Sequence, residues 1–324
     1  MIYQDFHGYK KAIADVRNGK KPICSIYIKE FYKPMLEEHR GMLSYLGEPI
    51  IEKWEDGLKE TLIRLRHHDE FFMIFNLKKI EVEWCFGVAS ALGYTKEDEE
   101  KWSIMDQHFL IHDRYYSTFL ALGFMMNGVL HDMNMQLTPL GHRYIINIPL
   151  RKRNGSYVWV KQLSTPISID ENGRMIRQFN SYTIISGYKG IALPFLPRIF
   201  LADGTRAREV EKNLFKRFMS SSLFSISPTQ KRVAQAALML WNKKFNAMGE
   251  SVDESRPIVP VSHQEIALFM RSHWGKIHSD ISQGTVRNHV NELKDRAEES
   301  FGFRFPGVVE VAQFLKKLYC LEED

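Results

Sequence analysis

The chain has 324 residues, of which 44% are hydrophobic and 26% are charged, and its formal net charge is +5. These proportions are ordinary for a folded protein with enough apolar residues for two cores. No apolar run reaches the roughly 18 residues of a membrane-spanning helix, and the first residues lack the basic-then-apolar order of a secretory signal. We therefore expect neither membrane insertion nor export, and we expect a cytoplasmic protein with no membrane partner.

The three cysteines are an odd number at wide spacing: Cys24, Cys85 and Cys320. They fit neither a disulfide framework nor a zinc knuckle. We interpret them as thiols in a reducing compartment.

Residues 1–66 are predicted to form a helical N-terminal extension. Apolar side chains recur there at helical spacing: Phe31, Met35, Met42, Leu46, Ile50, Trp54, Leu58, Leu62 and Leu65. So short a helical segment must bury its apolar stripe elsewhere, either by capping the neighbouring domain or in a dimer contact. Capping is the preferred interpretation.

Residues 67–190 combine strand and helix patterns. Two β-rich runs, 71–75 and 80–84, are followed by helical stretches that include 87–92 and 115–127. Three further strands are predicted at about 144–152, 157–166 and 174–185, with turns at Asn154-Gly155 and Asn172-Gly173. Asn-Gly pairs readily adopt the positive φ angles of tight hairpins, so they predict two β-hairpins.

Three short motifs in this region resemble landmarks of PAS domains: Leu92-Gly93-Tyr94-Thr95, Asn154-Gly155-Ser156-Tyr157-Val158-Trp159 and Asp170-Glu171-Asn172-Gly173. The order of two strands, several helices and a three-stranded meander is also similar to that family. The resemblance implies a sensor with a five-stranded antiparallel sheet whose helices enclose a small cavity. Pro149, which cannot donate to a β-ladder, is consistent with an edge strand.

Five aromatic residues are candidates for lining that cavity: Phe72, Phe75, Trp84, Tyr144 and Trp159. Core packing explains them equally well, and both interpretations stay open. The cofactor is unknown, because Cys85 lacks the sequence context of flavin-linked cysteines. His108, His112 and His131 are interpreted as packed or solvated side chains, since no second ligand at metal-binding spacing accompanies them. A haem or flavin sensor remains a third hypothesis.

Residues 191–225 are predicted to be a linker containing a basic helix over 206–219. The last region, 226–324, contains two helix starts. Ser262 with Glu265 forms a capping-box pattern, and Ser282 precedes a helix in which Val286, Val290, Leu293 and Ala297 share one face.

The opposite face of that second helix carries polar side chains suited to DNA. Arg and Asn match guanine and adenine edges, and Lys suits phosphate. The predicted DNA-binding residues are Ser282, Thr285, Arg287, Asn288, Asn291 and Lys294. An ordinary solvated amphipathic helix is the alternative interpretation.

The segments Glu265-Ile266-Ala267, Thr285-Val286-Arg287-Asn288-His289 and Val308-Val309-Glu310-Val311-Ala312 resemble the C-terminal domain of LuxR/GerE-type bacterial regulators. The resemblance implies an all-α helix-turn-helix that binds DNA, with the second helix inserted in the groove. Between Ala267 and Ile281 this chain is longer than that family's turn by roughly two helical turns.

Residues 226–324 carry 13 Lys and Arg against 13 Asp and Glu. Because phosphate neutralisation dominates DNA affinity, a neutral domain predicts weak monomer binding and a homodimer. No nucleotide-binding loop, nucleophile elbow or metal-binding helix motif is present in the sequence, so we expect no enzyme. The sequence therefore predicts an α+β chain that senses a signal and regulates transcription. A signalling adaptor acting through protein contacts is the alternative.

Overall fold

The computed structural model describes residues 54–135, 137–187, 197–219, 226–246, 259–301 and 304–318. The predicted helices before Trp54 therefore lie outside the described residues. The chain divides into two compact units, Met1–Leu214 and Phe215–Asp324. Among the described residues, no helix is both long enough and apolar enough to cross a membrane.

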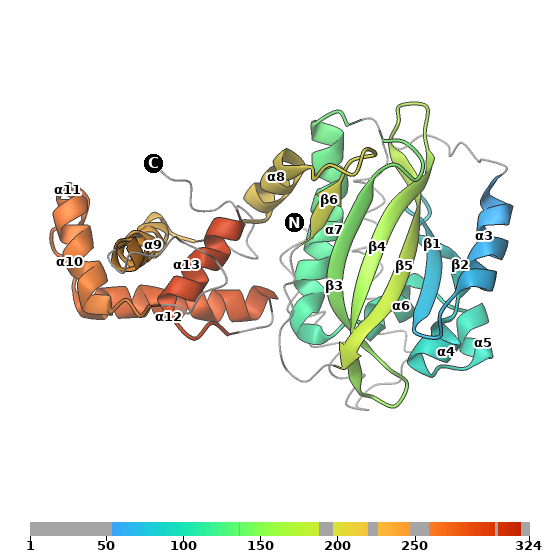
Figure 1. The fold of residues 1–324 in the computed structure, drawn as a ribbon, viewed down its shortest axis with the longest axis horizontal. Coiled ribbons are helices and arrows are strands. Elements are labelled where there is room, and N and C mark those ends of the chain that lie inside the picture. Colours follow the sequence, from blue (N-terminus) through green and yellow to red (C-terminus); the bar gives the residue numbers. More distant parts are fainter. Residues whose placement is uncertain are drawn as a thin grey trace. The chain divides into compact units, whose positions relative to one another are not determined.

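Unit 1 combines an antiparallel sheet with several helices (Figure 1). Its elements, in chain order, are α3 (Trp54–Leu65), β1 (Glu70–Asn76), β2 (Glu81–Phe86), α4 (Val88–Leu92), α5 (Lys96–Glu100), α6 (Ile104–Leu110), α7 (Asp113–Asp132), β3 (Arg143–Arg151), β4 (Tyr157–Ile169), β5 (Met175–Gly187), β6 (Arg198–Phe200) and the start of α8 (Arg208–Met219). The predicted order of two strands, helices and three strands is confirmed.

Among the described residues, the sheet has six strands in the order β2-β1-β5-β4-β3-β6, rather than the predicted five. The additional strand β6 pairs with Arg143–Ile145 of β3, so β3 is not an edge strand along its whole length. Pro149 lies beyond the residues that β6 pairs, and its carbonyl accepts a hydrogen bond from the backbone N–H of His112. The edge position predicted from Pro149 therefore holds only for part of the strand.

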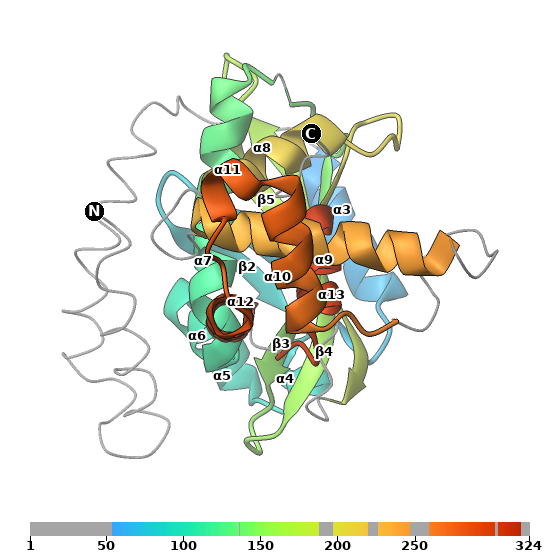
Figure 2. The same ribbon diagram turned by 90° about the vertical axis from the view of Figure 1, so that its left-hand side faces the viewer.

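Strand alternation gives the sheet two buried faces. On one face, Phe72, Ile74, Ile167 and Phe179 form an apolar cluster on which Leu62 of α3 packs. The described part of the N-terminal extension thus caps the sheet, although Leu65, predicted to share its stripe, is 72% exposed. Helices α6 and α7 lie on the other side of the sheet from α3 (Figures 1 and 2).

We call the side facing α6 the inner face. It carries Phe71, Met73 and Phe75 of β1, and Phe71 stacks on Tyr182 of β5 with ring centroids 4.5 Å apart. The side-chain amide of Gln107, on α6, donates to the Tyr182 hydroxyl at 3.3 Å. These contacts join the helices to the sheet through a surface that is only partly apolar.

Both predicted Asn-Gly hairpins form, but only their glycines have positive φ, 86° at Gly155 and 72° at Gly173. In each loop the glycine N–H bonds to the carbonyl three residues earlier, Lys152 or Asp170. These loops are therefore not the two-residue hairpin turn in which both residues have positive φ. They are the other common type, a turn followed by a single glycine with positive φ. The asparagines instead support the loops through hydrogen bonds at Ser156 and Asp170.

The described residues of unit 2 contain helices and no strand. This unit begins inside α8 and continues with α9 (Pro228–Asn246), α10 (His263–His273), α11 (Gly275–His278), α12 (Gln283–Phe301) and α13 (Val308–Lys317). Helix α9 contacts α10, α12 and α13, and its buried residues include Val233, Ala237 and Trp241. An aromatic cluster joins Phe218 to Phe301 and Phe301 to Phe314, with ring centroids 5.7 and 4.8 Å apart. The division between the units falls between consecutive residues of α8, upstream of the expected boundary at residue 226.

We expect Gly155→Ala to destabilise unit 1 by about 1–2 kcal/mol, because alanine resists the left-handed conformation. A Cβ at position 155 would meet its nearest neighbour at an ordinary 3.6 Å, so the loss should come from the backbone alone. Gly57→Ala in α3 is the matched control, since a Cβ there meets nothing within 4 Å and alanine favours a helix. Urea unfolding of both variants measures the difference, and equal stabilities would contradict the proposed origin of the turn.

Candidate nucleic-acid interface

Helix α12 begins at a serine cap. The Ser282 hydroxyl accepts a hydrogen bond from the Thr285 backbone N–H at 3.0 Å and lies 2.9 Å from the Thr285 hydroxyl. Both side chains are exposed. They are therefore at the surface as predicted, but each already takes part in starting the helix.

One face of α12 is buried. Val286, Val290, Leu293 and Ala297 are each at most 3% exposed, and α12 contacts α9 and α10. Residues separated by three or four positions share a helix face, so burial of this stripe turns the alternate positions outward.

Arg287, Asn288 and Asn291 occupy that outward side and are exposed. In the described part of the chain, none of the three forms a hydrogen bond or ion pair, so their polar atoms are available to a partner. Gly284 and Asp295 are exposed on the same helix.

Lys294 differs from the other predicted contacts. It is half-buried, and its ammonium group donates to the backbone carbonyl of Pro306 at 3.0 Å. This bond ties α12 to the segment that precedes α13. To contact a phosphate, the Lys294 ammonium group would have to bind it alongside the Pro306 carbonyl or give up this hydrogen bond.

His263, the first residue of α10, belongs to the same surface, and the sequence interpretation missed it. Its pKa is lowered by burial and then by the positive charges of Arg287 and Lys294. The three side chains therefore lie close enough to share an electrostatic field. The only signal in the sequence was its place immediately after the Ser262 cap, which is common to many helices.

Helix α10 is anchored as the sequence predicted, and more firmly. Ser262 and Glu265 form a complete capping box. Lys244 of α9 also lies 2.8 Å from the Glu265 carboxylate. The Lys244 hydrogen bond is the largest cause that lowers the pKa of Glu265 to about 2. The cap therefore also attaches α10 to α9.

The long connection between α10 and α12 is structured. It consists of the last turn of α10 and the short helix α11, and it ends near His278, which is 8% exposed. The Arg232 guanidinium of α9 lies 3.1 Å from Nε2 of His278, and because arginine only donates, that nitrogen accepts. Farther along, Gln230 donates to Glu292 of α12 at 2.6 Å. The additional residues thus extend the connection and pack it onto α9.

The five candidate cavity residues in unit 1 do not share one face. The strand register places Phe75 and Tyr144 on the inner face, and Phe72 and Trp84 in or against the cluster that Leu62 covers. Trp159 packs edge-on against Tyr115 of α7, with centroids 5.4 Å apart. These five residues therefore cannot line one common cavity.

The inner face instead carries buried polar side chains that sequence reasoning did not single out. Gln162 donates to Ser164 and to Asn180, and Ser164 also bonds to Asn180. Within the described part of unit 1, three atoms nearby have no hydrogen-bond partner: Oε1 of Gln162, Nδ2 of Asn180 and Oε1 of Gln107. Their residues are at most 4% exposed. A buried polar atom without a partner is costly, which points to a missing hydrogen-bonding group at this face.

No cofactor is indicated by the remaining candidates. Burial raises the pKa of the Cys85 thiol, which favours the unreactive protonated form. The His112 ring packs against Tyr115 and Tyr157, and His131 lies beside Asp132. The side chain of His108 lies outside those described. Over the described ranges, no group of three or more His, Cys, Asp and Glu side chains could hold a metal ion.

Comparisons with known proteins give no family assignment. No family model matches the chain, and no curated protein matches it. Among solved structures, the N-terminal domain of a diguanylate cyclase with PAS/PAC sensor from Marinobacter aquaeolei is 15% identical, covers 36% of this chain and 95% of its own, and has a TM-score of 0.26. The phage VqmA-DPO complex is 10% identical over 84% of this chain and 94% of its own, also with a TM-score of 0.26. At these TM-scores neither likeness carries an argument about function.

Acidification should loosen the connection between α10 and α12. Burial, then the charges of Arg232 and His289, lower the pKa of His278, so the unfolded chain takes up this proton more readily than the folded chain. Its neutral form therefore contributes stability above the ordinary pKa of about 6.5, which is lost as the pH falls through the lowered value. We expect the Tm of unit 2 to decrease between about pH 7.5 and about pH 5, and less steeply in His278→Gln. Circular dichroism melts test this, with the exposed His67→Gln as control; identical slopes in all three proteins would contradict the assignment.

Proposed function

We propose that this chain is a DNA-binding transcription regulator, in which unit 2 contains a LuxR/GerE-type helix-turn-helix formed by α10, α11 and α12. The observation that carries the proposal is the two-sided character of α12. Its apolar stripe is buried, and Arg287, Asn288 and Asn291 are exposed without partners in the described residues.

The three exposed side chains have the chemistry of base recognition. Arginine can bind both acceptors of guanine, and asparagine can bind the acceptor and donor of adenine. Thr285 and Lys294, at the margins of this surface, suit phosphate contacts that fix the register on the duplex. His263 adds an imidazole ring to this surface. The negative charge of a nearby phosphate would favour the protonated form of that ring.

Charge supports a dimeric form of this regulator. The 13 basic and 13 acidic residues of 226–324 cancel, so one copy has little long-range attraction for a polyanion. Arg304, which follows α12 in the chain, lies 3.8 Å from both Asp295 and Glu298 of that helix and locally offsets two acidic groups. Two copies on neighbouring half-sites would double the specific contacts, so we propose a homodimer.

Unit 1 is proposed to be the sensor, with a PAS-type sheet and helices. A signal can regulate DNA binding only if it binds two states of the protein with different affinity. The partnerless atoms of Gln107, Gln162 and Asn180 favour a small neutral ligand that both donates and accepts hydrogen bonds at the inner face. This reading makes the protein a cytoplasmic binding protein, not an enzyme.

The competing function is a signalling adaptor whose α12 surface binds protein. It predicts that Arg287→Ala alters partner binding and leaves DNA selection unchanged. Selection of random oligonucleotides by the full chain distinguishes the two functions, because an adaptor enriches no sequence.

Asn291→Ala should relax sequence preference by about 1–3 kcal/mol at one base pair, the usual contribution of a paired base contact.

Lys294→Ala should weaken binding to all sequences. It should also lower the slope of affinity against salt concentration by about one ion, because one phosphate contact is lost. Both variants are measured by fluorescence anisotropy with the selected duplex and a scrambled one over a range of salt.

Arg64→Ala is the control for these DNA-binding variants, because Arg64 is an exposed cation of α3 in the other unit. It should change neither preference nor salt dependence. The assignment fails if Asn291→Ala and Lys294→Ala lose equal affinity for both duplexes.

Gln162→Met should abolish binding of the sensed ligand, since it removes the partnerless Oε1 acceptor together with the two hydrogen bonds that Nε2 donates to Ser164 and Asn180; a thermal melt establishes that the variant folds. Mass spectrometry of small molecules released from purified wild-type and variant protein tests this. We expect a compound in the wild type that is at least tenfold depleted in Gln162→Met and retained in the exposed control Lys161→Gln. Equal amounts in all three would show that the inner face is not the binding site.

A further inference from the structure

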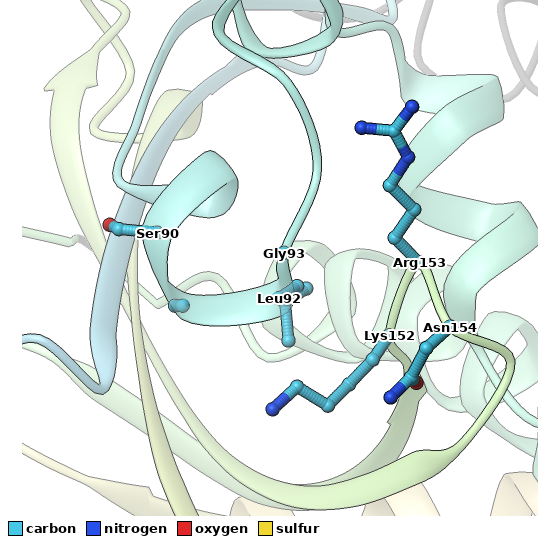
Figure 3. Close-up of a pocket in the computed structure, with 7 residues that line it drawn as sticks. Ser90, Leu92, Gly93, Lys152, Arg153 and Asn154 are labelled. Carbon is cyan, nitrogen blue, oxygen red and sulfur yellow. The ribbon is translucent and has the colours of Figure 1, made fainter.

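A concave site lies in unit 1, and its lining residues do not include those of the inner polar cluster. It is a cleft of about 450 Å³ between the end of α4 and the loop that joins β3 to β4. Figure 3 shows its lining residues, which are Ser90, Ala91, Leu92, Gly93, Lys152, Arg153 and Asn154. Its volume is within the range of sites for small organic molecules.

Both walls of the cleft are held by backbone hydrogen bonds. The Arg153 N–H donates to the Leu92 carbonyl at 3.0 Å, which attaches the loop to the end of α4. Gly93 ends that helix with φ at 78° and donates to the Ala89 carbonyl. Within the loop, the Lys152 N–H donates to the Ser156 carbonyl at 2.8 Å. The cleft is therefore preformed, and a ligand would pay little ordering entropy.

The lining combines an apolar floor with positive charge. Ala91 and Leu92 are at most 5% exposed, and no acidic residue lines the cleft. Lys152 extends below the end of α4 in Figure 3, and Arg153 extends away from it. Asn154 uses its side-chain oxygen to accept from Ser156, which leaves its amide NH₂ as a donor.

Lys152 has no structural role that accounts for its charge. It is half-buried, yet its ammonium group has no ion pair or hydrogen bond within the described ranges. Arg153, in contrast, is among the charges that lower the pKa of Asp98. The carbonyl groups at the end of α4 do little to stabilise the charge of Lys152. The Leu92 carbonyl already accepts from the Arg153 N–H, and the Ala89 carbonyl accepts from the Gly93 N–H.

We propose that this cleft binds a small organic anion, a carboxylate or a phosphate monoester. The anionic group would bind Lys152, with Asn154 as a further donor, and the apolar part of the ligand would lie over the end of α4 at Ala91 and Leu92. Charge-assisted hydrogen bonds supply affinity for the anion, and the apolar floor selects organic anions over inorganic ions. The site is separate from α12 and stands whether or not the chain binds DNA.

The test is calorimetric titration of the full chain, without DNA, using benzoate, phenyl phosphate and inorganic phosphate as probes. We expect saturable binding of benzoate or phenyl phosphate that is at least tenfold tighter than binding of inorganic phosphate. Lys152→Gln should weaken it by about tenfold or more, the usual effect of losing a charged hydrogen bond. The preferred head group distinguishes a carboxylate from a phosphate ligand.

Lys161→Gln is the matched control, because Lys161 is an exposed lysine of β4 that does not line the cleft. Lys152→Met provides a second variant if Lys152→Gln does not fold, which a thermal melt establishes, and it should also weaken binding. Equal binding by the variant and the control overturns the proposal. The proposal is also overturned if the organic probes do not saturate the protein. It is overturned as well if inorganic phosphate binds as tightly as the organic probes, which would indicate an adventitious ion only.

Discussion

The proposed interface depends on the burial of one side of α12. Val286, Val290, Leu293 and Ala297 are withdrawn from water in a unit where α12 contacts α9 and α10, and each fully buried aliphatic side chain contributes about 1.5–3 kcal/mol. With that stripe fixed, helical geometry leaves Arg287, Asn288 and Asn291 no orientation except outward. The remaining contacts of the unit, such as Gln230 with Glu292 and Lys244 with Glu265, set where α12 and α10 lie on α9.

The sheet of unit 1 shows the opposite arrangement, in which polar groups are buried. One face is an ordinary apolar core that α3 covers. The inner face holds Gln162, Ser164 and Asn180 in a hydrogen-bonded cluster with unmet donors and acceptors. A buried polar cluster of this kind costs stability unless a further group completes it. Such a cost is easier to understand at a binding face than in a core that serves only folding.

The two proposed ligand sites of unit 1 differ in chemistry. The inner face offers neutral amides and hydroxyls in a buried setting, which suits an uncharged molecule. The cleft beside α4 offers Lys152 and Arg153 at its rim and an apolar floor, which suits an anion. The two sets of residues do not overlap, so each site can be changed by substitutions that leave the side chains of the other in place.

Local chemistry determined much of this protein from the sequence alone. Strand alternation, Asn-Gly turns and serine caps located β1 to β5 and the starts of α10 and α12, because each depends on residues within a few positions of one another. The side of α12 that faces outward also followed from its period. Tertiary structure alone decided which strand face meets which helix, so Phe72 and Trp84 separated from Phe75 and Tyr144. It likewise brought His263 within the electrostatic influence of Arg287, added β6, and brought Lys152 to Leu92 across the chain. These features arise from pairings between residues far apart in the sequence, and no local pattern specifies such pairings.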